Sequence, residues 1–185
     1  MRVCISGKIS HTERCRSDEG MMEPQVLILM GSNSDFAVVE ETVKMLKEFD
    51  IPFEVTIASA HRTPERVRKI TVEAEGRGIE VIIAAAGAAA HLAGAVASHT
   101  LLPVIGVPID SSPLHGFDAL LSTVQMPPGV PVATMAVGKA GAKNAALFAA
   151  QILARKDRSL FKKLLAYRER VASEVEAKAE ALKVP

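Results

Sequence analysis

Short apolar runs recur along the chain and alternate with loops and with segments of helical periodicity. Most of these runs are almost continuously apolar, which is typical of strands that helices cover on both faces. A loop and then a helical pattern follow each run, so the sequence predicts successive βα units and a parallel sheet. The predicted strands are Gln25 to Met30, Phe53 to Ala58, Glu80 to Ala86, Val104 to Val107 and Val132 to Met135.

The helical period is clearest directly after the first apolar run. Further helices are predicted for residues 64–76, for the Ala-rich residues 140–155 and for residues 157–182. Right-handed crossovers leave few arrangements for such units. We therefore predict an α/β fold, a three-layer doubly wound parallel sheet of flavodoxin-like order with an extra C-terminal helix. The apolar positions of the first helix are Phe36, Val39, Val43, Leu46 and Phe49.

The same pattern divides the chain into three parts. Residues 1–22 are polar and mixed in charge, without the apolar stretch of a signal peptide, and we expect a disordered extension. Residues 23–156 form one predicted α/β domain. Residues 157–185 form the predicted C-terminal helix, and its narrow stripe alone does not decide whether it packs on its own domain or on a neighbouring subunit. The stripe consists of Leu160, Leu164, Tyr167 and Val171.

Composition and charge exclude several classes of partner. The net charge is +1, which gives no electrostatic case for binding nucleic acid or an anionic membrane. Aromatic residues make up 4% and Trp is absent, so base-stacking surfaces are not expected. Residues 81–97 are mostly Ala and Gly, and they divide better into a strand, a turn and a helix than into a membrane span. We expect a soluble, cytoplasmic protein.

Both cysteines, Cys4 and Cys15, lie near the start of the chain, so no disulfide framework is predicted. Together with His11 they match no metal-ligand spacing. No metal site is therefore expected.

The loop after the first strand carries Ser32, Ser34 and Asp35 behind Gly31. Two hydroxyls and the N–H groups of a helix start can hold a phosphate. Asp35 would repel a phosphate and suits ribose hydroxyls better. The alternative is structural, with Ser34 or Asp35 simply capping the helix.

The loop after the second strand, Ser59-Ala60-His61-Arg62-Thr63-Pro64, joins an imidazole to a fixed cation. Small ligands bind at the carboxyl ends of strands in open α/β sheets, and this loop lies there. Arg62 can offer two N–H groups to phosphate or carboxylate, and His61 can exchange a proton near neutral pH. The alternative is a hydrogen-bonded structural histidine beside a solvated arginine.

The loop after the third strand, Gly87 to Leu92, contains His91 as its one ionisable side chain. Such a loop can contact a ligand through backbone N–H groups and an apolar wall that excludes water. The alternative is that Ala88 and its neighbours pack helix against strand while His91 caps or plugs the turn. Farther along, Gly138-Lys139 lacks the Walker spacing and predicts a helix start.

These motifs together resemble the N5-carboxyaminoimidazole ribonucleotide mutase family of purine biosynthesis. They occur in the family's order and spacing over roughly residues 24–155. The motifs are Met30-Gly31-Ser32-Asn33-Ser34-Asp35, Ser59-Ala60-His61-Arg62-Thr63-Pro64, Ala90-His91-Leu92, Gly106-Val107-Pro108, Val124-Gln125-Met126-Pro127 and Gly138-Lys139-Ala140-Gly141.

The resemblance implies roles for particular residues. Its proton-transfer histidine falls on His61, which would protonate the amine as the carbamate breaks and then remove the ring proton. The family often has glycine at Ala85 and Ala88, and we expect these methyl groups to narrow the pocket without abolishing activity. The implied substrate-binding residues are Ser32, Ser34, Asp35, Ser59, Ala60, Arg62, Gly87, Ala88, His91 and Leu92.

The resemblance also implies a small-molecule ribonucleotide substrate, a homo-octamer, and chemistry without ATP, metal or organic cofactor. Two alternatives stay open. One is the related aminoimidazole ribonucleotide carboxylase, which uses free carbon dioxide, although Ala90-His91-Leu92 resembles the mutase branch. The other is a non-catalytic flavodoxin-like ligand-binding module, in which His61 would be dispensable.

Overall fold

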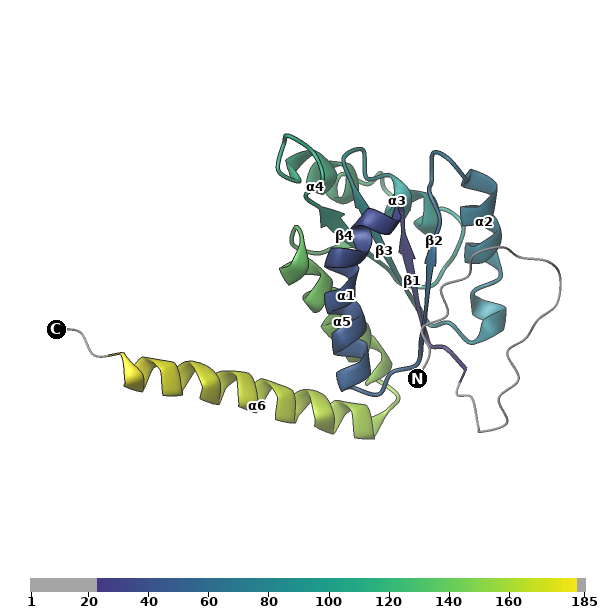
Figure 1. Cartoon of the computed structure of the whole chain (residues 1–185). Helices are drawn as coiled ribbons and strands as arrows, with labels where there is room; N and C mark the ends of the chain where they lie inside the picture. The colour runs from purple at the N-terminus through teal and green to yellow at the C-terminus, as the bar shows by residue number, and fades with distance from the viewer. Residues whose placement is uncertain (1–22, 183–185) are drawn as a thin grey trace.

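The computed structural model describes residues 23–182, and Figure 1 shows a parallel sheet between helices. The sheet order is β2-β1-β3-β4-β5, which confirms the predicted flavodoxin-like order. Met30 at the end of β1 lies opposite Ile57 and Ala85, so the loops after neighbouring strands leave the sheet at the same edge. The strands are β1 Val26–Met30, β2 Phe53–Ile57, β3 Val81–Gly87, β4 Val104–Ile109 and β5 Ala133–Thr134.

Two hydrophobic cores lie on the two faces of the sheet. The helices α1 (Phe36–Glu48) and α5 (Lys139–Leu153) cover one face, where the Thr42 hydroxyl donates to the Ala142 carbonyl at 2.8 Å. The helices α2 (Pro64–Val72), α3 (Leu92–Ala97) and α4 (Phe117–Val124) cover the other face. Figure 1 shows α1 and α2 on opposite sides of the strands.

Most of the predicted helical positions are where the periodicity places them. Val39, Val43, Leu46 and Phe49 are buried, whereas Phe36, the first residue of α1, is 40% exposed. The segment predicted as one helix over residues 64–76 is α2 followed by a short 3-10 turn at Glu75–Arg77. The sequence therefore predicts the buried faces better than the helix ends.

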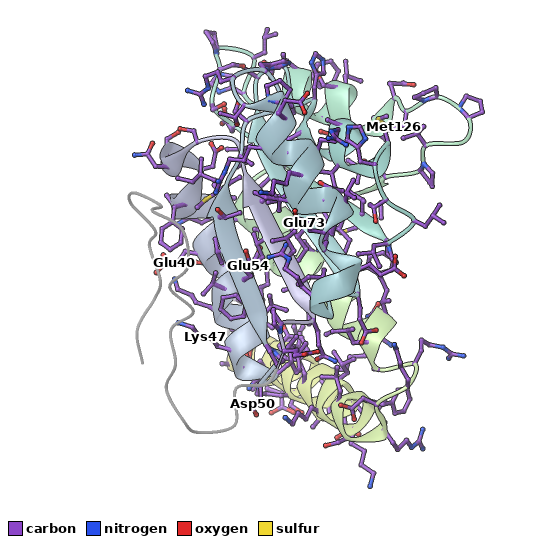
Figure 2. The ribbon with its side chains drawn as sticks, turned by 90° about the vertical axis from the view of Figure 1, so that its right-hand side faces the viewer. Glu40, Lys47, Asp50, Glu54, Glu73 and Met126 are labelled. Atoms are coloured by element: carbon purple, nitrogen blue, oxygen red, sulfur yellow. The ribbon has the colours of Figure 1, made fainter. Side chains whose placement is uncertain are left out.

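The last helix, α6 (Arg158–Ala181), leaves the domain after its first turns. Leu160 is buried and Tyr167 packs edge-on against Phe49 with ring centroids 5.6 Å apart, but Val171 is 39% exposed. Lys163 contacts Asp50, which Figure 2 labels at the end of α1, with a 3.0 Å ion pair. Figure 1 shows the rest of α6 projecting away from the domain.

The extension predicted for residues 1–22 lies outside the described residues, together with Cys4, His11 and Cys15. Within residues 23–182, no helix is long and apolar enough to cross a membrane. The same residues contain no cluster of side chains that could hold a metal ion.

Candidate active site

The loops after β1, β2, β3 and β4 enclose a cavity of about 410 Å³ at the carboxyl edge of the sheet. This is the edge at which the sequence places the candidate site. Its lining is Gly31, Ser32, Ser34, Asp35, Ser59, Ala60, His61, Arg62, Ala86, Gly87, Ala89, His91, Leu92 and Ser111.

Of the residues that the resemblance implies, only Ala88 does not line this cavity. Ala88 is exposed, and its φ of 51° places its backbone in the left-handed region. The expectation that the Ala85 methyl narrows the pocket is wrong as well. Ala85 is fully buried in the core beneath α1 and α5 and does not line the cavity.

Four lining residues, Gly31, Ala86, Ala89 and Ser111, are absent from the implied substrate-binding set, although Gly31 and Ala89 belong to the first and third loops that the sequence assigns to the site. Ser111 follows β4, so the rule that ligands bind at the carboxyl ends of strands could have found it. Ala86 and Ala89 carry no polar group that would distinguish them from packing residues.

The first loop is built as a capping box at the 3-10 turn Asn33–Asp35, which leads into α1. The Ser32 hydroxyl accepts from the Ser34 N–H, and the Asp35 carboxylate accepts from the Ser32 N–H at 3.0 Å. The Asp35 carboxylate therefore takes part in the cap of the 3-10 turn, with Ser32 rather than Ser34 as the other member, but it makes no capping hydrogen bond to α1. The same side chains line the cavity, so capping does not exclude contact with a ligand.

Asp35 is the buried acid of the site, with 5% of its surface exposed. Burial raises the pKa of its carboxyl above the ordinary value of 3.8, while the N–H groups of Ser32 and Gly31 and the Arg62 charge oppose that rise. A carboxyl with a raised pKa gives up its proton less readily than an exposed one.

Hydroxyl groups fix the second loop from both ends. The Ser59 N–H donates to the Thr63 hydroxyl at 3.0 Å, and that hydroxyl donates to the Ser59 carbonyl at 3.1 Å. Arg62 donates from Nη2 to the Gly31 carbonyl at 2.8 Å and from Nε to the Ser59 hydroxyl at 3.3 Å. The guanidinium is thus anchored between the first two loops at the cavity wall. Its Nη1 makes no hydrogen bond to another of the described residues.

The two histidines of the site contact one another across the cavity. Nε2 of His61 lies 2.8 Å from Nδ1 of His91, and the rings are nearly perpendicular at 81°. His91 precedes α3 but its side chain makes no capping hydrogen bond, so the capping prediction for His91 is wrong.

Close packing shapes the third loop. A Cβ added to Gly87 would collide with the Ser111 hydroxyl and come within 3.0 Å of the Ile109 carbonyl oxygen. Ala90 and Leu92 are each 2% exposed, so the loop is held by burial rather than by side-chain hydrogen bonds. Together the loops place a pair of imidazoles, a guanidinium and an apolar wall around one small cavity.

Comparison with known proteins agrees with this arrangement. The chain matches the model of the family described as AIR carboxylase over residues 25–174. It is 55% identical over 160 residues to the N5-carboxyaminoimidazole ribonucleotide mutase of Pyrococcus horikoshii, with 86% of this chain and 89% of that protein covered. It is 54% identical to the mutase of the same name from Thermotoga maritima, with coverages of 86% and 92%.

A solved structure supports the same relationship. The crystal structure of Treponema denticola PurE superimposes with a TM-score of 0.79 at 33% identity, covering 87% of this chain and 99% of that one. The family match spans far more than half of the chain, and it includes every loop that lines the cavity. The chain therefore belongs to the AIR carboxylase family, as its sequence motifs indicate.

Proposed function

We propose that this protein is a mutase that interconverts N5-carboxyaminoimidazole ribonucleotide and 4-carboxy-5-aminoimidazole ribonucleotide in de novo purine biosynthesis. The observation that carries the proposal is the identity of 52–58% with relatives named N5-carboxyaminoimidazole ribonucleotide mutase. The histidine that the resemblance assigns to proton transfer also lines the cavity at the edge of the sheet.

The proposed reaction uses His61 as its one general acid and base. The bond between nitrogen and the carboxylate carbon breaks, carbon dioxide is released, and the exocyclic nitrogen takes a proton from His61. The ring carbon then attacks the carbon dioxide, and its proton returns to His61. Protons and electrons balance without any oxidant or co-reactant, and such a group contributes about 10²–10⁴-fold in rate.

The polar residues of the first two loops would bind the ribonucleotide. Ser32, Ser34 and the anchored Arg62 offer hydroxyl and N–H donors to the phosphate, and Asp35 offers an acceptor to the ribose. These contacts would hold the aminoimidazole ring of the substrate near His61. Holding the reacting groups in position raises the reaction rate.

The apolar residues of the third loop would retain carbon dioxide. Gly87, Ala89 and Leu92 carry no hydrogen-bonding side chain, and they line the cavity together with Ala60 and Ala86. A wall of this kind excludes water from an uncharged intermediate.

The two alternatives are less well supported. The mutase name carried by relatives above half identity favours neither the carboxylase nor a binding module without catalysis. The decisive test supplies N5-carboxyaminoimidazole ribonucleotide without ATP, and in parallel aminoimidazole ribonucleotide with bicarbonate. We expect the ring-carboxylated product at far higher rate in the first assay. Turnover confined to the second assay would show that the protein is a carboxylase rather than a mutase.

We further propose that the protein is a cytoplasmic homo-octamer. Exposed apolar side chains on α5 and α6 support self-association, among them Phe148 at 37%, Phe161 at 37% and Leu165 at 46%. They line a groove of about 580 Å³ between the two helices. Light scattering of the purified chain tests this: a mass of eight chains supports the proposal and the mass of a single chain contradicts it.

A further inference from the structure

One hydroxyl of the cavity lining, that of Ser111, makes no hydrogen bond to another of the residues 23–182 that the structure describes. Every other hydrogen-bonding side chain of the lining has such a partner. The polar side chains of the first two loops bond one another or nearby backbone groups, and His61 contacts His91. A ligand can therefore bind the Ser111 hydroxyl without breaking a hydrogen bond between described residues.

The end of β3 makes room for this hydroxyl. Gly87 is the last residue of β3 and lies opposite Ile109 in the parallel register, two residues before Ser111. A Cβ built on Gly87 would collide with the Ser111 hydroxyl oxygen, so this oxygen occupies the space in which a side chain at residue 87 would begin. The glycine thus lets the hydroxyl lie close against the backbone of β3, where both residues line the cavity.

The hydroxyl adds a donor to a part of the lining that is otherwise poor in polar groups. The end of β3 and the loop after it supply Ala86, Gly87, Ala89 and Leu92, which carry no hydrogen-bonding side chain. A charged group that loses its water at such a wall needs a hydrogen-bond donor in exchange. A serine hydroxyl can donate one hydrogen bond to a carboxylate oxygen, and bonds to charged acceptors are stronger than those to neutral ones.

We propose that Ser111 is a substrate-binding residue, whose hydroxyl donates a hydrogen bond to the carboxylate that migrates between the exocyclic nitrogen and the ring carbon. The proposal rests on the mutase function proposed above and deepens it. In that function the first two loops bind the phosphate and the ribose, which leaves the carboxylate to the wall of the third and fourth loops. Ser111 is not among the binding residues that the resemblance implies.

Two ligands that differ only in the carboxylate test this assignment. They are 4-carboxy-5-aminoimidazole ribonucleotide and aminoimidazole ribonucleotide, and calorimetry of the full-length protein measures the Kd of each. The His61→Asn variant serves as the background, so that the carboxylated ligand is not converted during the titration. Adding Ser111→Ala should weaken binding of the carboxylated ligand about tenfold, because a hydrogen bond to a charged group is lost, and should leave the other Kd unchanged. Equal weakening for both ligands, or no weakening for either, would overturn the proposal.

A purely structural role for the hydroxyl predicts a different result. Ser111→Ala keeps the Cβ that lies beside Gly87 and removes only the oxygen, so we expect urea titration to give the same free energy of unfolding as for the wild type. A clear loss of stability, with equal weakening for both ligands, would assign the hydroxyl to packing and overturn the proposal.

The matched control is Ser98→Ala in the same background. Ser98 is exposed, directly follows α3 and does not line the cavity, so both Kd values should stay as they are without it. Failure of the proposed function has a separate sign, which is a wild type that does not turn over N5-carboxyaminoimidazole ribonucleotide.

Discussion

Two loops that meet across the cavity are held in opposite ways. The loop of residues 59–63 is largely exposed and is tied by hydroxyl groups: that of Thr63 bonds the Ser59 backbone, and that of Ser59 accepts from Arg62. The loop of residues 87–91 has few polar side chains and is fixed by burial of Ala90 and by the close approach of Gly87 to Ser111. Their contact point is the pair of His61 and His91.

The difference separates two tasks of one site. The hydrogen-bonded loop can present an imidazole and a guanidinium to a polar ligand because its exposed side chains stay hydrated until the ligand arrives. The packed loop offers few polar groups to a ligand, but its fixed shape can exclude water. Substitutions in the first loop should therefore change chemistry, and substitutions in the second should change shape and stability.

The largest effect is expected in the hydrogen-bonded loop. His61→Asn should lower kcat by about 10²–10⁴-fold, because it removes the one group proposed to exchange protons. Substrate binding, measured by calorimetry, should persist because the anchors of Arg62 do not involve His61. The matched control is His99→Asn, outside the cavity, which should turn over normally. A normal rate for His61→Asn would remove His61 from the mechanism.

The next largest effect is expected in the packed loop. Gly87→Ala would place a methyl group 2.8 Å from the Ser111 Cβ and 3.0 Å from the Ile109 carbonyl oxygen. We expect the free energy of unfolding to fall by about 1–3 kcal/mol through overpacking, as measured by urea titration. Adding Ser111→Gly should restore part of it, and Gly76→Ala, which meets no atom within 4 Å, serves as the control. Equal stability of Gly87→Ala and wild type would contradict the packing account.

The pH dependence of stability tests the raised pKa of Asp35, the buried acid of the site. The pKa of Asp35 is raised in the folded state by burial, so folding favours its protonated form. The stabilising contribution is therefore full below the unfolded value of 3.8 and is lost as pH rises through the folded pKa. Relative to Asp35→Asn, the wild type should lose stability over that rise, by at most about 1.4 kcal/mol per pH unit. Urea titrations of both proteins from acid to neutral pH measure this difference in the free energy of unfolding. If the wild type instead gained stability relative to Asp35→Asn as pH rises, the pKa of Asp35 would be lowered rather than raised by folding.

The smallest effect is expected at Ala88, which has a φ of 51°. Left-handed backbone costs an L-residue about 1–2 kcal/mol, and glycine avoids that cost at a smaller loss of chain entropy. Ala88→Gly should therefore raise the free energy of unfolding by about 0.5–1 kcal/mol. Ala89→Gly, whose φ is not positive, should lower it. Thermal unfolding of the pair checks the sign, and a loss in Ala88→Gly would show that this turn is not strained.

Much of the fold and most of the cavity lining follow from the sequence. Continuous apolar runs predict buried parallel strands, and the rule for strand ends locates Ser32, His61 and Arg62 at one edge. The contact of His61 with His91 could not be predicted, because the two residues lie on separate loops whose distance depends on packing. The orientation of Ala85 escaped prediction because a continuously apolar strand does not reveal which residues face which layer.

The packed loop also hides its own geometry. Nothing in an alanine run distinguishes Ala89, which lines the cavity, from Ala88, which does not. The two residues differ in that Ala88 has a positive φ. Glycine is the residue usually found at a positive φ, so an alanine there gives no indication of a left-handed turn.

The claim that one loop moves a proton while the other retains carbon dioxide can be tested by following the carbon. N5-carboxyaminoimidazole ribonucleotide labelled with carbon-13 in its carboxylate is converted in the presence of excess unlabelled bicarbonate, and mass spectrometry measures the label in the product. We expect the ring-carboxylated product to keep the label, because carbon dioxide does not leave the cavity between the two steps. Loss of the label to the bicarbonate pool, with unlabelled product, would contradict it.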